Sequence, residues 1–163
     1  MRIYLDNCCF GRPFDNQNFP RIAEEAKAQV FIENQIRLGN VELATSYMLH
    51  YENLQCPRKP RREYVARFLK SHTSIYVNVG SAELVMTKAE KFISEGIKQK
   101  DAYHLASAIV AGCDYFLSVD DRLLKHNSDE IILINPVDFL EVFGGELNGL
   151  RRKIIATRHE MSD

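Results

Sequence analysis

The sequence predicts an α/β fold in which helices cover both faces of a central parallel sheet. Short apolar runs recur along the chain at Ile3–Leu5, Val41–Ala44, Ile75–Val77, Tyr115–Val119 and Ile131–Ile134. Segments with the apolar periodicity of helices separate these runs. Strands that alternate with helices form parallel sheets, because each connection crosses back over the sheet. We therefore expect a three-layer α/β/α domain with a sheet of four to five strands.

Length and composition exclude several classes of protein. The chain has 163 residues, the size of one ordinary domain, and a hydrophobic fraction of 45%, typical of soluble globular proteins. No apolar run approaches the ~18 residues of a membrane span, and the N-terminus lacks a signal-peptide pattern. We therefore expect a cytoplasmic protein without membrane contact. Its four cysteines include the adjacent Cys8 and Cys9 but no C-x-x-C motif, which indicates reduced thiols rather than disulfides or zinc ligands.

The first half of the chain is expected to hold one long loop and three helices. The segment Asn7–Pro20 is polar and rich in turn residues, and we predict an irregular loop there. A helix is predicted from about Pro20 to Gly39, because proline favours the first helical turn and glycine the end. Two more helices are predicted, one capped by Thr45 or Ser46 and reaching about Gln55, and one over residues 58–72.

The second half is expected to hold four more helices. One follows Ser81 and ends at Gly96, and the next runs from about Lys100 to Ala111 with a tight apolar stripe. A short helix is predicted over residues 122–126, and a last one from Pro136 to Phe143. Because Gly144-Gly145 interrupts the helical pattern, we predict one domain over residues 1–145 and a basic C-terminal tail over residues 146–163. A final helix, a partner-binding arm and a partly disordered segment are the alternatives for this tail.

Four carboxylates are expected at one edge of the sheet. Asp6 and Asp120 each follow an apolar strand, Asp101 lies in the first turn of a helix, and Glu52 lies on the helix after the second strand. In open α/β sheets, ligands bind beyond the carboxyl ends of the strands, where these acids are predicted to lie. Each acid also has a structural explanation as a helix cap, a turn residue or a surface side chain. Only their coincidence at one edge favours a site.

Four ionised carboxylates at one edge require compensation. Two like charges ~4 Å apart repel by ~4 kcal/mol at an effective dielectric constant of ~20. Either the pKa values of these acids rise, or a hard divalent cation binds them. Ligands that are all oxygen atoms favour Mg²⁺ or Mn²⁺ over zinc. Such a site can activate water and bind a phosphodiester during an in-line displacement.

The order of these residues resembles the PIN-domain family, which includes VapC-type ribonuclease toxins. The strongest likeness lies in Asp101–Ala108 and in the Ser118-x-Asp120 motif, and the resemblance covers roughly Arg2 to Gly145. It implies that Asp6, Glu52, Asp101 and Asp120 are catalytic and hold Mg²⁺ or Mn²⁺, and that the hydroxyl of Ser118 orients the site. The chain departs from the family pattern directly after Asp6, where Asn7 and then Cys8 stand in place of a small hydroxyl residue followed by asparagine.

Several further residues are candidates for supporting roles. Asn7, His104 and Asp121 lie close in sequence to the acids, although a packed histidine and a helix-capping aspartate are the structural alternatives. A basic strip interleaved with aromatic residues suits single-stranded RNA, and its alternative is a solvated helix face. The candidate RNA-binding residues are Arg58, Lys59, Arg61 and Arg62 in this strip, with Arg12 and Lys100 nearer the acids.

The sequence therefore predicts a Mg²⁺- or Mn²⁺-dependent endoribonuclease that hydrolyses RNA phosphodiester bonds. The family resemblance implies, in addition, a toxin with a small antitoxin partner and a homodimeric assembly. The alternative is a binding module of the same fold that recognises RNA or protein and does not cleave RNA. A phosphoryl-transfer domain with an aspartyl nucleophile fits less well, because the haloacid-dehalogenase pattern needs a second aspartate where Cys8 stands.

Overall fold

The structure is a computed structural model that describes residues 1–160, without the side chains of residues 150, 151 and 153–160. Five parallel strands form one sheet in the order β3-β2-β1-β4-β5. This confirms the predicted PIN-like α/β/α fold and its strand number. The strands are β1 (Arg2–Leu5), β2 (Glu42–Ser46), β3 (Thr73–Val77), β4 (Tyr115–Leu117) and β5 (Ile132–Ile134).

The helices lie close to the predicted positions. Ser46 caps α3 as predicted, because its Oγ accepts a hydrogen bond of 3.2 Å from the Leu49 amide. Ser81 holds the capping position of α5 but makes no capping hydrogen bond through its side chain. The helices are α1 (Asn7–Gly11), α2 (Pro20–Arg37), α3 (Tyr47–Leu54), α4 (Lys59–His72), α5 (Ala82–Ser94), α6 (Gln99–Val110), α7 (Asp121–Leu124) and α8 (Pro136–Glu160), with 3-10 turns at Arg12–Phe14 and Val79–Ser81.

Strand β1 is the centre of the sheet. It pairs with β2 on one side and with β4 on the other, and its residues Ile3, Tyr4 and Leu5 are 0% exposed. A strand buried on both faces must be apolar along its whole length, which explains why β1 shows no alternation. Because the chain moves from β1 to β2 in one direction and later to β4 in the other, the strand order reverses at β1. Ligands of doubly wound sheets bind at this point, beyond the carboxyl ends of the strands.

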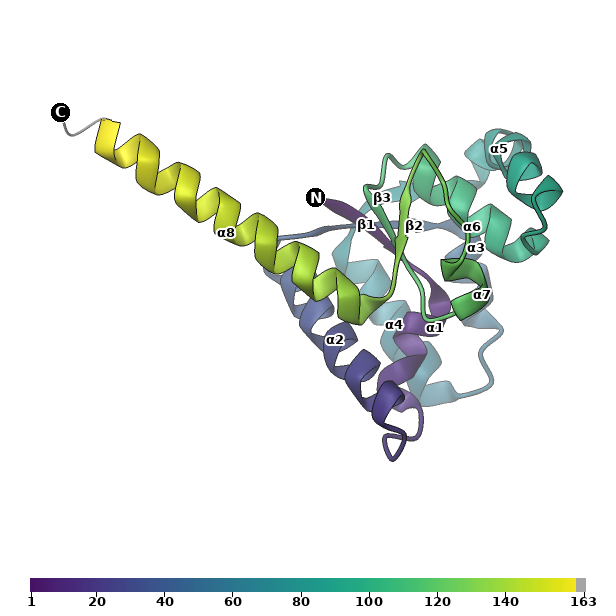
Figure 1. Ribbon diagram of the computed structural model, residues 1–163. Helices are drawn as coiled ribbons and strands as arrows, with labels where there is room; N and C mark the ends of the chain where they lie inside the picture. Colours follow the sequence, from purple (N-terminus) through teal and green to yellow (C-terminus); the bar gives the residue numbers. More distant parts are fainter. Residues whose placement is uncertain (161–163) are drawn as a thin grey trace.

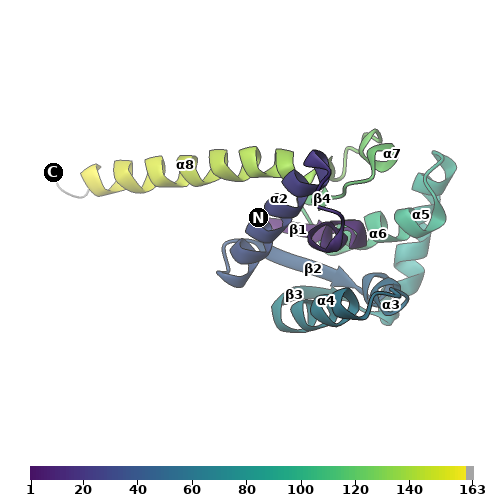
Figure 2. The ribbon, with the colours of Figure 1, turned by 90° about the horizontal axis from the view of Figure 1, so that it is seen from below.

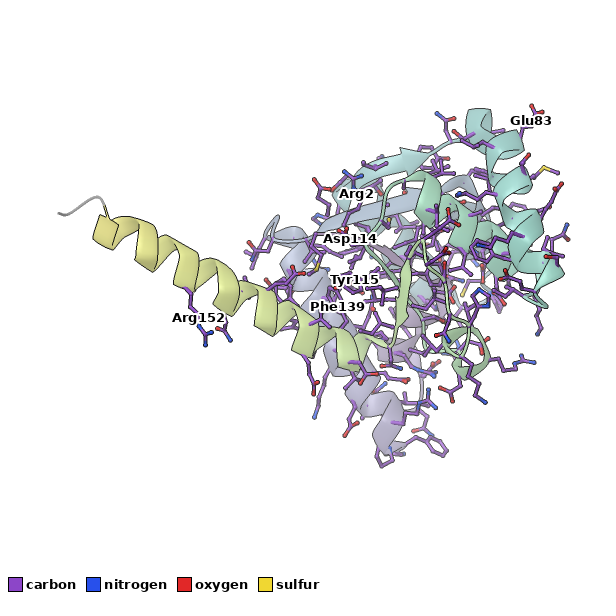
Figure 3. The ribbon with its side chains drawn as sticks, turned by 45° about the horizontal axis from the view of Figure 1, so that its top comes forward. Arg2, Glu83, Asp114, Tyr115, Phe139 and Arg152 are labelled. Carbon is purple, nitrogen blue, oxygen red and sulfur yellow. The ribbon has the colours of Figure 1, made fainter. Side chains whose placement is uncertain are left out.

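The two ends of the molecule are covered by different helices. Helix α2 packs against α8, and α5 packs against α6. Figures 1 and 2 show α5, α6 and α7 gathered at one end, whereas the C-terminal half of α8 extends away from the body at the other. At the amino ends of the strands, the amide of Arg2 donates a hydrogen bond of 2.8 Å to Asp114, and the two residues lie near each other in Figure 3. The carboxyl ends carry the acids.

The prediction of an irregular loop over Asn7–Pro20 was wrong in its first half. Residues Asn7–Gly11 form α1, and a 3-10 turn follows at Arg12–Phe14. The cause is tertiary, because Cys9 and Phe10 are 0% exposed and the Phe10 ring lies 5.9 Å from that of Phe68 on α4. Burial of this short helix outweighs a sequence that favours turns.

The prediction that Gly144-Gly145 ends the last helix was also wrong, because α8 continues from Pro136 to Glu160. Its first turns are held by packing, since Phe139 contacts Tyr115 at 5.5 Å and Phe143 contacts Phe31 at 6.1 Å between ring centroids. Tertiary packing offsets the cost of glycine in a helix, about 1 kcal/mol each. Arg152 of the predicted basic tail is exposed (Figure 3), and the side chains of its other basic residues lie outside the described part.

No helix within residues 1–160 combines the length and the hydropathy needed to cross a membrane.

Candidate metal site

The carboxyl ends of β1 and β4 bring Asp6 against Ser118. The amide of Asp6 donates to the carbonyl of Leu117 at 2.9 Å, and Ser118 Oγ donates to Asp6 Oδ2 at 2.9 Å. Ser118 Oγ also accepts a hydrogen bond of 3.1 Å from the amide of Asp120. Asp6 stands at the capping position of α1 but makes no capping hydrogen bond through its side chain. Its carboxylate is therefore bound to the end of β4 and does not cap the turn that follows it.

Asp6 is a buried carboxylate without a cationic partner. It is 7% exposed, and it forms no ion pair within the described part of the chain. Burial raises the pKa of Asp6 well above its ordinary value, and the neighbouring Cys8 raises it further. The Cys8 thiol lies 3.2 Å from Asp6 Oδ2 and 3.4 Å from Ser118 Oγ. Sequence reasoning treated Cys8 only as a departure from the family pattern, although its position two residues after Asp6 was a signal that it borders the site.

Asp101 and Asp120 lie close enough to each other to interact electrostatically. Both line one cavity of about 280 Å³. Burial raises the pKa of Asp101, and the negative charges of Asp120 and Glu52 raise it further, whereas His104 has the opposite effect. This is the repulsion between neighbouring carboxylates that the sequence predicted. The structural explanation of Asp120 also holds, because its Oδ1 accepts a hydrogen bond of 2.9 Å from the Arg122 amide and caps α7.

Glu52 differs from the aspartates because the protein supplies its cation. Lys100 Nζ lies 3.2 Å from Glu52 Oε1, and His104 Nε2 lies 2.6 Å from Glu52 Oε2. Burial alone would raise the pKa of Glu52, but the hydrogen bonds from His104 and Lys100 outweigh it and lower the pKa to about 2. His104 is 1% exposed, and its Nδ1 shares a hydrogen bond of 2.7 Å with the Tyr4 hydroxyl. His104 therefore holds the Glu52 carboxylate in place by a hydrogen bond, and it has no exposed surface that could contact phosphate.

The donor set fits a hard divalent cation held by few protein ligands. Within residues 1–160 no three His, Cys, Asp or Glu side chains are close enough together to bind one ion. Mg²⁺ does not need such a cage, because it keeps several waters and uses one or two carboxylates with substrate phosphates. The aspartates offer only oxygen atoms, and burial raises the pKa of both Asp6 and Asp101. One or two of the aspartates Asp6, Asp101 and Asp120 would hold the ion, with waters and substrate phosphate as its other ligands.

Two of the predicted supporting residues have structural partners. Asp121 is turned away from the acids, because both its carboxylate oxygens accept hydrogen bonds of 2.7 Å from Arg21 on α2. These bonds lower the pKa of Asp121. Asn7 is buried, its carbonyl accepts a hydrogen bond of 2.9 Å from Arg61, and its Oδ1 has no hydrogen-bond partner among the described residues.

Most of the predicted RNA-binding arginines hold the protein's own backbone or acids. Arg61 lies against α1, where its guanidinium carbon would be 3.0 Å from a Cβ at Gly11, so a larger residue there would require the Arg61 side chain to shift. Arg62 donates to the Cys56 carbonyl at 2.7 Å, and Arg58 donates to the Phe14 carbonyl at 3.0 Å. Arg12 lies 2.5 Å from the buried Glu25.

The two predicted RNA-binding lysines are more available. Lys59 is exposed and lies 3.8 Å from Glu63, at the limit of an ion pair. Lys100 is exposed as well, but it pairs with Glu52 as described above. Within the strip, Arg58, Arg61 and Arg62 therefore bind the protein itself, whereas Lys59 remains exposed.

Comparisons with known proteins show the fold and no more. No family model matches the sequence, and no curated protein matches it. Among solved structures, FitAcB from Neisseria gonorrhoeae is similar with a TM-score of 0.50 and 15% identity, over 82% of this chain and 97% of that chain. FitAB bound to an IR36 DNA fragment is similar with a TM-score of 0.51 and 17% identity, over 83% of this chain and 95% of that chain.

Proposed function

We propose that the protein is a Mg²⁺- or Mn²⁺-dependent endoribonuclease. The observation that carries the proposal is that Asp6 and Asp120 lie at the carboxyl ends of β1 and β4, where strand order reverses, and that Asp101 lines one cavity with Asp120. Asp6 and Asp101 form no ion pair within the described part of the chain, in contrast to Glu25 and Glu52. When bound there, a divalent ion would polarise the scissile phosphate and activate the attacking water.

The chain's own residues would prepare this chemistry. Ser118 binds the Asp6 carboxylate and the Asp120 amide at once, and so sets the orientation of two acids from two elements. His104 and Lys100 keep Glu52 ionised at neutral pH, because they lower its pKa to about 2. Burial and the neighbouring Asp120 and Glu52 raise the pKa of Asp101, and a divalent ion bound beside it would have the opposite effect.

Cleavage of RNA by purified protein tests the proposal directly. Structured and unstructured RNAs are incubated with and without Mn²⁺, and Asp6→Asn and Asp101→Asn are compared with the wild type. We expect metal-dependent cleavage that either substitution abolishes while the circular dichroism spectrum stays unchanged. Undiminished metal-dependent cleavage by pure Asp6→Asn protein would contradict the assignment of the site.

A second candidate function, a binding module without catalysis, is favoured by one observation. No group of three potential ligands within residues 1–160 is arranged to hold an ion. Isothermal titration with Mn²⁺ separates the two candidates when it is combined with the cleavage assay. Metal binding without cleavage of any RNA pool would favour the module.

We also propose that the protein works with a small antitoxin and forms a homodimer. The support is the family resemblance of its motifs to VapC-type toxins, together with a fold similar to that of FitAB. Co-expression with a small reading frame immediately upstream of the gene, followed by light scattering of the purified sample, tests both. A monomer that captures no product of that reading frame would contradict this part of the proposal.

A further inference from the structure

A cavity of about 280 Å³ lies beside Asp101 and Asp120, between the turn that joins α5 to α6 and helix α7. All three helices lie at the end of the molecule opposite to the free end of α8 (Figures 1 and 2). The turn depends on Gly96, whose φ of 93° is one that other residues rarely adopt. The cavity is near the lower limit of small-molecule pockets, ~300 Å³, and admits a group of nucleotide size but no duplex.

Two lysines with no ion-pair partner face this cavity from different elements. Lys98 stands at the capping position before α6, and Lys125 at the end of α7. Both are exposed, and neither forms an ion pair with any residue whose side chain the structure describes. Arg122 is a third cation of the rim, and its Nε lies 4.0 Å from Asp120 Oδ1. Because Arg61 and Arg62 of α4 bind the protein's own backbone, these two lysines are the more available cations near the acids.

The interior of the cavity is partly apolar and includes a fixed aromatic ring. Ile97 and the buried Leu123 line it together with His126. The His126 ring packs edge-on against Phe92 at 5.7 Å between centroids, and its Nε2 lies 3.1 Å from Glu95 Oε2. Nucleobases stack on aromatic rings that the protein holds in place, and they do so with little sequence preference.

We infer that this cavity binds one nucleotide of a single-stranded substrate, adjacent to the phosphate held at the acids. Lys98 and Lys125 bind its phosphate, and the surface formed by Ile97, Leu123 and His126 accepts its base. The inference deepens the proposed function and rests on it for the identity of the strand as substrate. The chemistry recognised is that of a base with its phosphate, which RNA and single-stranded DNA share.

Binding of a labelled pentamer tests the role of the lysines without any cleavage. The probe is fluorescein-labelled pentaadenylate, and fluorescence anisotropy is measured with Asp6→Asn protein and with the same protein carrying Lys98→Ala or Lys125→Ala. Each lysine substitution is expected to raise Kd roughly fivefold and to reduce the salt dependence by roughly 0.7 in log–log slope. Pentadeoxyadenylate is measured in parallel, and lysine-dependent binding of either strand supports the inference.

The matched control is Lys70→Ala. Lys70 is also exposed and forms no ion pair with the residues that the structure describes, but it lies near the end of α4, which leads into the amino end of β3. It is therefore at the edge of the sheet opposite to the cavity. Its substitution is expected to leave Kd within about twofold, as for ordinary surface changes. Equal losses in Lys70→Ala and in the two cavity variants would overturn the inference, because they would indicate general charge attraction.

Competition separates a nucleotide subsite from a phosphate site. Adenosine 5′-monophosphate should displace the pentamer at roughly tenfold lower concentration than inorganic phosphate, because stacking contributes ~1–3 kcal/mol per base. His126→Ala should reduce this advantage without changing the inhibition by phosphate. Equal competition by phosphate and the nucleotide would overturn the assignment of the apolar surface to a base.

Cleavage kinetics distinguish failure of this inference from failure of the proposed function. In otherwise wild-type protein, Lys98→Ala and Lys125→Ala are expected to raise KM several-fold with little change in kcat. RNA cleavage with an unchanged KM in both variants would overturn the nucleotide subsite alone. A wild-type protein that cleaves no RNA but binds the pentamer through these lysines would overturn the proposed function and support the subsite.

Discussion

Two buried carboxylates, Glu25 and Asp6, are treated by the protein in opposite ways. Glu25 on α2 is 1% exposed and accepts hydrogen bonds from Arg12 at 2.5 Å, Arg21 at 2.9 Å and Asn135 at 2.8 Å. Burial alone would raise the pKa of Glu25, but the bonds from Arg21, Asn135 and Arg12 outweigh it and lower the pKa. Glu25 is therefore a carboxylate whose charge the fold already compensates.

Asp6 is nearly as buried, at 7% exposure, but only Ser118 and Cys8 donate hydrogen bonds to its side chain. Neither donor carries a positive charge, and burial raises the pKa of Asp6 well above its ordinary value. A buried ion without compensation destabilises a fold, so its presence requires a functional explanation. The comparison shows that burial does not separate a structural acid from a site acid, whereas the identity of the donors does.

The largest expected effect is on catalysis by Asp6→Asn. We expect RNA cleavage to fall by roughly 10²-fold or more, the scale seen for groups that stabilise a transition state, while stability is maintained or increases. Initial cleavage rates in the presence of Mn²⁺ measure the loss of activity, and urea unfolding measures the stability. Asp129→Asn, at an exposed carboxylate that lies outside the cavity of Asp101 and Asp120 and near Met1 and Asp114, is the control and should retain full activity. Loss of stability in Asp6→Asn without loss of activity would make the two carboxylates equivalent.

The next effect is stabilisation by metal. At 100 times Kd, Mn²⁺ should raise the free energy of unfolding by about 2.7 kcal/mol, since it binds only the folded state. This gain should vanish in Asp6→Asn and persist in Glu25→Gln, because Glu25 already has its cations. Thermal unfolding at graded Mn²⁺ concentrations measures it. An equal gain in both variants would place the metal elsewhere.

Removal of Glu25 tests the structural half of the comparison. Glu25→Ala should lower the free energy of unfolding by about 2 kcal/mol, because Arg12, Arg21 and Asn135 all lose a buried acceptor, although both arginines are partly exposed and keep a second acidic partner. Cleavage per folded molecule should be retained. Urea unfolding gives the stability, with Glu24→Ala as the matched control at an exposed glutamate of the same helix. A loss no larger than that of the control would show that the ion pairs contribute nothing.

The smallest effect is an opposite pH dependence of the two acids in metal-free protein. Because the folded pKa of Glu25 is lowered, its contribution is present above the unfolded value of ~4.3 and is lost as pH falls through the folded pKa. Because the folded pKa of Asp6 is raised, stability declines as pH rises from ~3.9 toward that pKa. Urea unfolding between pH 3 and pH 7 should show Glu25→Gln losing the first slope and Asp6→Asn the second. Slopes of the same sign would contradict the comparison.

The sequence by itself determined the fold and the edge on which the acids lie. Apolar runs such as Ile3–Leu5 form strands wherever they are buried, and helices between them make the sheet parallel. Once the sheet is parallel, Asp6 and Asp120 must lie at the same edge, because each follows a strand. These patterns involve residues that are close together in the chain, so they can be recognised from the sequence alone.

Only the tertiary structure decided which charges have partners. Asp121 pairs with Arg21 across 100 positions, and Arg61 binds the Asn7 carbonyl across 54 positions, so no local pattern indicates either contact. Burial likewise formed α1 in a segment that favours turns and carried α8 through Gly144-Gly145. The physical reason is that a charge is compensated by whichever group the fold brings within a few ångströms. Packing of the whole chain sets that distance. It brings two arginines to Glu25 but only uncharged donors to Asp6.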